Sequence, residues 1–445
     1  MIWGTRIFRH KSFYLVSAVG AVLIVLVTLA SGLVSSGWDE IYGRTRIVGS
    51  AEPETVSVHL LFSRSGGDEN ASPALDHYVE HLTWLNAFAA SRHTARHSNA
   101  WTSDIALGYW LSGAPEDLPA MLRTLSRVFD PITLSREFAN QERDIVRREY
   151  DLRLANRPDA QAAEDMDAFL YQGNAIAASV IGTPGQINAL RFDDAKAQHR
   201  AIHQPEWSSL LVTGDVSPRQ VRRIMKQVGF PHQPGGPTDI APPPFVLSQP
   251  DLRVVTLSAA DAAPRMIWRK VVTLPKPVSF DLLDAQTRLL RDILESTLPG
   301  GIVGPLRFDT LVAKSFQIAV FPIDERHVEL NFRAEPGKDI GFDELRACFE
   351  AALTASAQGI PAETYARVHE RFRSFWPEWS NKEATRDWMA SYVLDRASNL
   401  RVPMTETELA ALHSLLSAQD IDALVAALAG PGRTAIAFIG KDKIK

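Results

Sequence analysis

Two histidines and a glutamate form a short pattern that could hold a metal ion: His77, Glu80 and His81 read H-x-x-E-H. On a helix, residues four apart lie on one face, so both imidazoles can bind one ion from adjacent turns. Glu80 lies between them, close enough to exchange a proton with a water on that ion. Two imidazoles, a carboxylate and an open position form the ligand set of a hydrolytic zinc site. The pattern therefore predicts metal-dependent hydrolysis.

A third ligand is expected on the next helical stretch rich in carboxylates, residues 141–150. Glu142 and Glu149 are seven residues apart, which corresponds to two turns on one helix face. The alternative for such a stretch is a solvated helix laced with charges. Pro158 is the expected stop signal for the helix.

Together these motifs resemble the pitrilysin/insulinase metallopeptidases, the inverzincins, which include the mitochondrial processing peptidases and related bacterial proteins. That family combines H-x-x-E-H with a distant helix that carries E-x-x-x-x-x-x-E. The resemblance implies one Zn²⁺ per chain, with His77, His81 and Glu149 as ligands. Glu80 would be the general base, and Glu142 would assist it by orienting a ligand or by holding Glu149 in place.

Other segments carry the same resemblance. Asn99–Ser103 is similar to the family's N-A-x-T segment, the edge strand that pairs with the substrate backbone. This similarity implies that Asn99, Ala100 and Thr102 bind substrate. Further stretches look like the first long strand, a later loop and the closing strand of the family's first domain: Val56–Phe62, Gly182–Pro184 and Trp207–Asp215.

The second half of the chain departs from the family at one substrate-binding position. Leu306–Ala313 resembles the family's L-R-x-x-x-L-x-Y segment and keeps Arg307, but Ala313 stands where tyrosine is expected. In the family that tyrosine helps to bind the substrate and to polarise the scissile carbonyl, so a partner chain could supply it here. An ordinary surface arginine is the alternative for Arg307.

Composition limits the function classes. With 445 residues and 45% hydrophobic content, the chain is long enough for two or three domains. A net charge of −5 gives no basic footprint for nucleic acid. The single cysteine, Cys348, excludes an intramolecular disulfide and a cysteine-rich structural zinc site.

The N-terminal region predicts a membrane anchor. Residues 13–34 contain no charged residue and are long enough to span a bilayer, whereas the core of a signal peptide is shorter. Basic residues in segment 1–12 place that segment in the cytoplasm. The prediction is a single-pass protein of a bacterial inner membrane with its catalytic part in the periplasm. The alternative is a cleaved signal peptide and secretion.

Beyond the anchor, the chain reads as two similar halves. A stretch rich in proline and glycine, residues 233–245, separates a zinc-binding peptidase domain at 46–232 from a second, metal-free domain at 246–445. Each half opens and closes with strand-like apolar runs and has helical periodicity between them. The expected fold is α+β, with two tandem homologous α/β-sandwich domains, each an antiparallel sheet packed with helices.

The predicted function is that of a zinc-dependent endopeptidase acting on peptides or unfolded polypeptides. Metal-activated water would attack the peptide carbonyl, with Glu80 as the base. An extended substrate would add as a strand beside residues 99–102. One alternative is a non-catalytic, membrane-anchored binding or assembly subunit. Another is one chain of a two-chain peptidase, as a homodimer or a heterodimer with a related chain.

Overall fold

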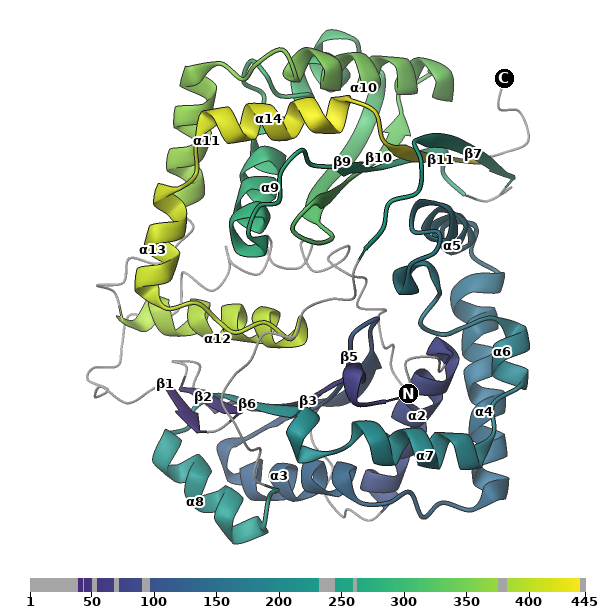
Figure 1. The fold of residues 1–445 in the computed structure, drawn as a ribbon, viewed down its shortest axis with the longest axis vertical. Coiled ribbons are helices and arrows are strands. Elements are labelled where there is room, and N and C mark those ends of the chain that lie inside the picture. The colour runs from purple at the N-terminus through teal and green to yellow at the C-terminus, as the bar shows by residue number, and fades with distance from the viewer. Residues whose placement is uncertain are drawn as a thin grey trace. The chain divides into compact units, whose positions relative to one another are not determined.

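The computed structural model describes most of the chain beyond residue 38: residues 39–42, 44–49, 54–67, 72–89, 97–231, 245–258, 262–374 and 382–440. The predicted anchor at 13–34 and nearly all of the predicted linker at 233–245 lie outside these residues. Within the described ranges, none of the helices has the length and apolar composition that crossing a bilayer requires. The chain divides into two compact units, which are described separately (Figure 1).

Unit 1 contains residues up to Tyr150 together with Ser179–Ala241 and Pro377–Pro403. Its sheet has six strands in the order β1-β2-β6-β3-β5-β4. Their bounds are β1 (Asp39–Tyr42), β2 (Thr45–Gly49), β3 (Val56–Ser63), β4 (His97–Thr102), β5 (Ala106–Gly113) and β6 (Ser208–Gly214). Neighbouring strands are antiparallel, except that β2 and β6 run parallel. The expected all-antiparallel sheet is therefore corrected to a mixed one.

Helices cover both faces of this sheet. On one side lie α2 (Pro73–Ala89), α3 (Leu118–Ser126), α7 (Phe192–Ile202) and α8 (Pro218–Val228). On the other side lies α12 (Lys382–Ser398), against β2 and β6 (Figure 1). Strand alternation explains this arrangement, because Ile47 joins the core on the first side and Val48 packs with Met389 and Val393 of α12. Two further helices, α4 (Arg136–Tyr150) and the short α6 (Pro184–Asn188), pack beside α2.

Unit 2 contains Asp151–Ala178, Pro242–Trp376 and the residues from Met404 onward. Its five strands have the order β7-β11-β8-β10-β9. They are β7 (Asp251–Ser258), β8 (Arg265–Thr273), β9 (Ala313–Pro322), β10 (His327–Pro336) and β11 (Arg433–Gly440). As in unit 1 from β2 onward, the first strand runs parallel to the last and the other neighbours are antiparallel. The shared topology supports the expected pair of similar domains.

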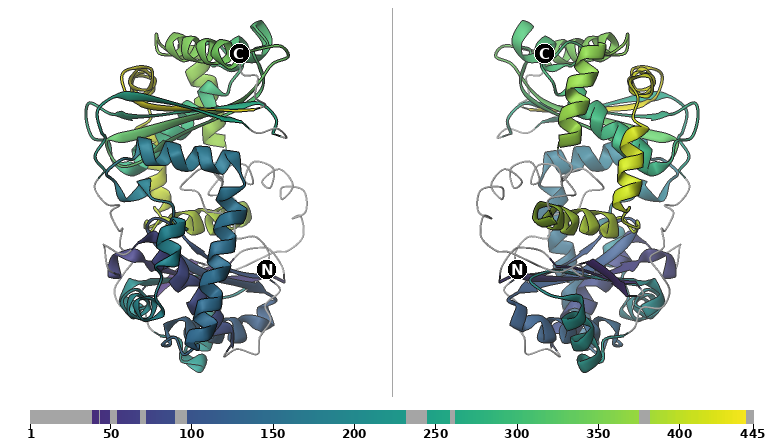
Figure 2. Two further views of the ribbon diagram at one scale, coloured as in Figure 1. Left: turned by 90° about the vertical axis from the view of Figure 1, so that its right-hand side faces the viewer. Right: turned by 90° about the vertical axis from the view of Figure 1, so that its left-hand side faces the viewer.

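Figure 2 shows the layers of unit 2 from the side. One face of its sheet carries α9 (Phe280–Leu294), α10 (Phe342–Ser356) and α14 (Ala418–Ala429). Against α9 pack α11 (Ala362–Ser374) and α13 (Glu406–Ser414). The other face is covered by α5 (Pro158–Leu170).

The two units differ from the sequential halves by an exchange of segments. Residues 151–178, placed by sequence in the first domain, pack in unit 2, and residues 377–403, placed in the second domain, pack in unit 1. In α5 the exchange follows from an apolar stripe at helical spacing, Ala162, Met166 and Leu170, all buried in the core of unit 2. Each half of the sequence thus contributes one helix to the other unit.

A buried ionic network attaches α5 to the sheet of unit 2. The guanidinium of Arg269 on β8 donates from Nε to Glu329 Oε1 at 2.6 Å, and from Nη2 to Asp167 Oδ1 at 2.8 Å. The same Nη2 donates to the Tyr171 hydroxyl at 3.0 Å, and that hydroxyl donates to Glu329. Burial, reinforced by the charge of Glu329, holds the pKa of Tyr171 well above its usual range. The hydroxyl therefore stays protonated and keeps its donor role.

Candidate functional site: a metal centre in unit 1

Helix α2 places the two motif histidines on one face. Their ring centroids are 4.7 Å apart, with the ring planes at 86°. His77 is buried and His81 partly buried. Pro73 begins the helix, where the missing N–H of proline costs nothing. The predicted i, i+4 arrangement of His77 and His81 is therefore present in the structure.

Glu149, in the last turn of α4, completes a compact set of donor atoms. Its Oε2 lies 3.6 Å from His77 Nε2 and 3.3 Å from His81 Nε2. Tetrahedral zinc with such ligands keeps its donors about 3.4 Å apart. Among the residues that the structure describes, no other group of three metal-binding side chains comes together in this way. The donor set therefore fits a zinc ion in both chemistry and spacing.

A hydrogen bond between two buried segments helps to hold α4 against α2. The hydroxyl of Tyr78, next to His77, donates to the backbone oxygen of Ala139 at 2.6 Å. Burial raises the pKa of Tyr78 to about 12, so the hydroxyl remains a donor. This contact fixes the helix that carries Glu142 and Glu149.

Glu142 contacts His81, one of the predicted metal ligands. Its Oε1 lies 2.7 Å from Nδ1 of His81, which fixes the imidazole so that Nε2 faces Glu149. Burial lowers the pKa of His81, but the hydrogen bonds with Glu142 and Glu149 outweigh it and raise the pKa to about 10. The surrounding carboxylates thus favour positive charge at this point. Glu142 thus lies within hydrogen-bond distance of His81, and its role in the reaction stays a prediction.

Glu80 lies on α2, between the two histidines, and is buried. Its Oε2 accepts a hydrogen bond from Thr102 Oγ1 at 2.9 Å. Thr102 ends β4, and β4 is an edge strand as predicted. The side chain of Ala100 is packed in the core, so a predicted contact with substrate could involve only its backbone. Asn99 alternates to the other face of the sheet.

The remaining substrate-binding candidate, Arg307, belongs to unit 2. It is exposed on a π-helical segment, Gly304–Asp309. Ala313, where the family has tyrosine, is buried at the start of β9. A part for Arg307 in substrate binding stays a prediction.

Asp76, the residue before His77, fixes the start of α2. Its buried carboxylate pairs with the guanidinium of Arg64 and accepts from Gln198 Nε2 at 2.8 Å. The same guanidinium donates to the backbone oxygens of Ser103 and Asp104. Nothing in the sequence pattern pointed to this cluster, since Asp76 and Gln198 are 122 residues apart.

Asp76→Ala is expected to destabilise the protein by about 1.5–3 kcal/mol, because hydrogen bonds to a charged group are lost and Arg64 keeps no carboxylate on α2. The measurement is urea unfolding followed by circular dichroism. The control is Asp130→Ala, which removes an exposed ion pair with Arg127 and should change stability by less than about 0.5 kcal/mol. Equal effects of the two substitutions would contradict this role for Asp76.

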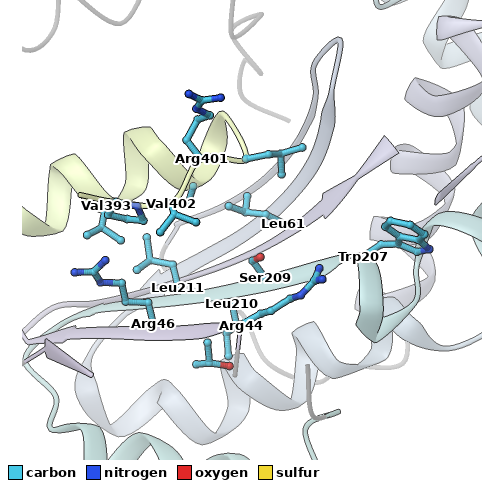
Figure 3. A pocket seen from close by; sticks show the side chains of 14 residues that line it. Arg44, Arg46, Leu61, Trp207, Ser209, Leu210, Leu211, Val393, Arg401 and Val402 are labelled. Carbon is cyan, nitrogen blue, oxygen red and sulfur yellow. The ribbon is translucent and has the colours of Figure 1, made fainter. Parts of the chain in front are cut away.

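Unit 1 also has a pocket away from the metal centre, between β2, β6 and the end of α12. Its cavity volume is about 70 Å³. Three arginines line it, Arg44, Arg46 and Arg401, but their guanidinium groups point in different directions (Figure 3). The pocket therefore lacks the convergence that would recognise an anion, and none of the predicted site residues lines it.

Known proteins resemble this chain in structure and not in sequence. No protein-family model and no curated protein sequence matches the chain. A protease from Helicobacter pylori is 17% identical, with a TM-score of 0.66 over 91% of this chain and 100% of its own. A putative M16-like peptidase from Alicyclobacillus acidocaldarius is 15% identical, with a TM-score of 0.70 over 92% and 100%. The inactive peptidase M16 domain from Pseudomonas fluorescens is 11% identical, with a TM-score of 0.68 over 92% and 99%.

Structural similarity at such low sequence identity establishes the fold only. The chemistry has to be argued from the residues of the site. The similar structures include one described as a protease, one as a putative peptidase and one as an inactive domain, so the fold by itself does not establish catalysis. The chain has the fold of the M16-like peptidases, the pitrilysin/insulinase type.

Proposed function

We propose that this chain is a zinc-dependent endopeptidase that hydrolyses peptides or unfolded polypeptides. The observation that carries the proposal is the convergence of His77, His81 and Glu149 beside the buried carboxylate of Glu80. A binding protein that had lost catalysis would have no need of three ligands with a base next to them. The protease fold of the similar structures supports the same class of reaction.

The residues would divide the reaction among them. When bound, a zinc ion would lower the pKa of a water and polarise the scissile carbonyl. His77, His81 and Glu149 would hold the ion, and Glu142 would keep His81 in the orientation that binds it. Glu80 would take the proton of the attacking water on its carboxylate and return it to the leaving amine.

The substrate would lie along β4 as an added strand. This strand is at the edge of the unit 1 sheet, and the main-chain groups on its outer side can pair with an extended peptide. Backbone pairing recognises an extended conformation more than a particular side chain. Peptides and unfolded segments are therefore the proposed substrate class.

Metal removal tests the proposal directly. The purified chain should contain about one zinc per molecule, measured by atomic emission, and should cleave fluorescein-labelled casein. Dialysis against a chelator should abolish both, and added Zn²⁺ should restore them while Mg²⁺ should not, because magnesium prefers oxygen ligands. Cleavage that survives complete removal of zinc would exclude this mechanism.

A second candidate is a non-catalytic subunit or one chain of a two-chain peptidase. It is favoured by Ala313, which is buried where the family's tyrosine is expected, and by the inactive domain among the similar structures. Zinc binding without cleavage by the chain alone would support this candidate. Cleavage that appears on adding a related chain would then identify a homodimeric or heterodimeric enzyme.

The same proposal includes a location. The uncharged run at residues 13–34 supports a membrane anchor, with the enzyme on the periplasmic side of a bacterial inner membrane. Secretion after cleavage of that segment is the alternative.

A further inference from the structure

We propose that Thr102 is a positioning residue that orients the carboxylate of Glu80, and that its side chain does not bind the substrate. This inference rests on the proposed function, because Thr102 would act on the reaction by orienting Glu80, the proposed general base. The resemblance to known peptidases had placed Thr102 with the substrate-binding residues of the edge strand. In the structure, however, the Thr102 hydroxyl donates to Glu80, which gives the side chain a different role from binding substrate.

The contact itself is short and sheltered. Thr102 Oγ1 donates to Glu80 Oε2 at 2.9 Å, and Glu80 is only 6% exposed. A glutamate side chain has three rotatable bonds, so an unanchored carboxylate would sample many orientations. A hydroxyl that holds one oxygen removes much of this freedom before the substrate arrives. Preorganisation of this kind is how a positioned base gains efficiency.

The direction of the Thr102 side chain follows from strand alternation. Ala100 and Thr102 point to the same face of the sheet, and Ala100 is packed in the core beneath the helices. The Thr102 hydroxyl therefore faces α2, where Glu80 lies. A peptide added at the edge of β4 would pair with backbone groups.

The end of β4 is held firmly enough to serve as an anchor. Just beyond Thr102, the backbone N–H of Ser103 donates to Ala106 at 2.8 Å. Arg64 Nη1 donates to the backbone oxygen of Asp104 at 2.8 Å, and the same guanidinium pairs with Asp76 on α2. The turn after β4 and the start of α2 are thus linked through one arginine. Threonine adds stiffness, because its β-branched side chain has few rotamers.

The test compares Thr102→Val, which keeps the shape and removes the hydroxyl, with Thr102→Ser, which keeps the hydroxyl. The probe is an internally quenched peptide that the full chain cleaves, chosen from a mixed-sequence pool. Thr102→Val should lower kcat about 10-fold or more, with KM within about 2-fold and zinc content unchanged. Thr102→Ser should keep most of the native kcat. Thr256→Val is the matched control, because Thr256 is an exposed threonine on β7 in unit 2, and it should leave kcat unchanged.

Several results would overturn the inference. An unchanged kcat in Thr102→Val would show that the hydroxyl does not act on the base. A raised KM with a native kcat would show that the side chain binds substrate. An equal loss of kcat in Thr256→Val would show that the effect is not specific to Thr102.

A second measurement separates this inference from the proposed function. In metal-free protein, a double-mutant cycle of Thr102→Val and Glu80→Ala compares the urea midpoints of the native chain, both single variants and the double variant. A double-variant shift smaller than the sum of the single shifts supports the contact. If the native chain cleaves no peptide, the proposed function fails, and the cycle still decides the contact. Additive shifts would overturn it.

Discussion

Glu80→Gln should lower kcat/KM for peptide cleavage by about 10²–10⁴-fold while zinc content stays at the native level. The magnitude is that of a lost general base. Glutamine has nearly the same shape as glutamate and still accepts a hydrogen bond, so the contact from Thr102 can persist. The proposed ligands His77, His81 and Glu149 are unchanged in this variant, which is why metal binding should remain.

The assay is cleavage of the quenched peptide, with zinc determined on the same samples. Glu137→Gln is the matched control, because Glu137 is an exposed glutamate on α4 that has no part in the site. It should cleave at the native rate. Native cleavage by Glu80→Gln would assign the base to another group, and loss of zinc in that variant would show that Glu80 supports the ligands instead.

Arg269→Ala should destabilise the protein by about 3–5 kcal/mol, the cost expected when one partner of a buried ion pair is removed. Arg269 is 2% exposed and Glu329 is fully buried. Without the guanidinium, Glu329 would be left in an apolar interior, and of the donors in this network only the hydroxyl of Tyr171 would remain to it. The substitution also removes the bond to Asp167, which joins α5 to β8.

The measurement is the free energy of unfolding from urea titration. A matched control exists on the same two elements, because Arg265 of β8 pairs with Asp159 of α5 at a more exposed position. Arg265→Ala should cost at most about 1 kcal/mol, as solvent screens that pair. If the two substitutions lower the free energy of unfolding equally, burial would not explain the contribution of the Arg269 network to stability.

Local periodicity accounts for the part of the site that the sequence predicted. The spacing of His77 and His81 and the seven-residue separation of Glu142 and Glu149 are properties of single helices, and α2 and α4 form where those patterns lie. The opening and closing strands of both halves follow from their apolar, β-branched runs, as seen in β3 and β11. These features depend on neighbours within a few turns of chain.

The tertiary structure decided how these elements meet. The hydrogen bond from Thr102 to Glu80, the cluster around Asp76 and the exchange of α5 and α12 join residues from separate elements. Such contacts depend on the register of the sheet and on which apolar faces of helices and strands pack against each other. A pattern read along one chain does not contain that information. The sequence alone therefore determined the candidate ligands and their helices, whereas the packing of α2, α4 and β4 decided that the donor atoms converge and that Glu80 accepts a hydrogen bond from Thr102.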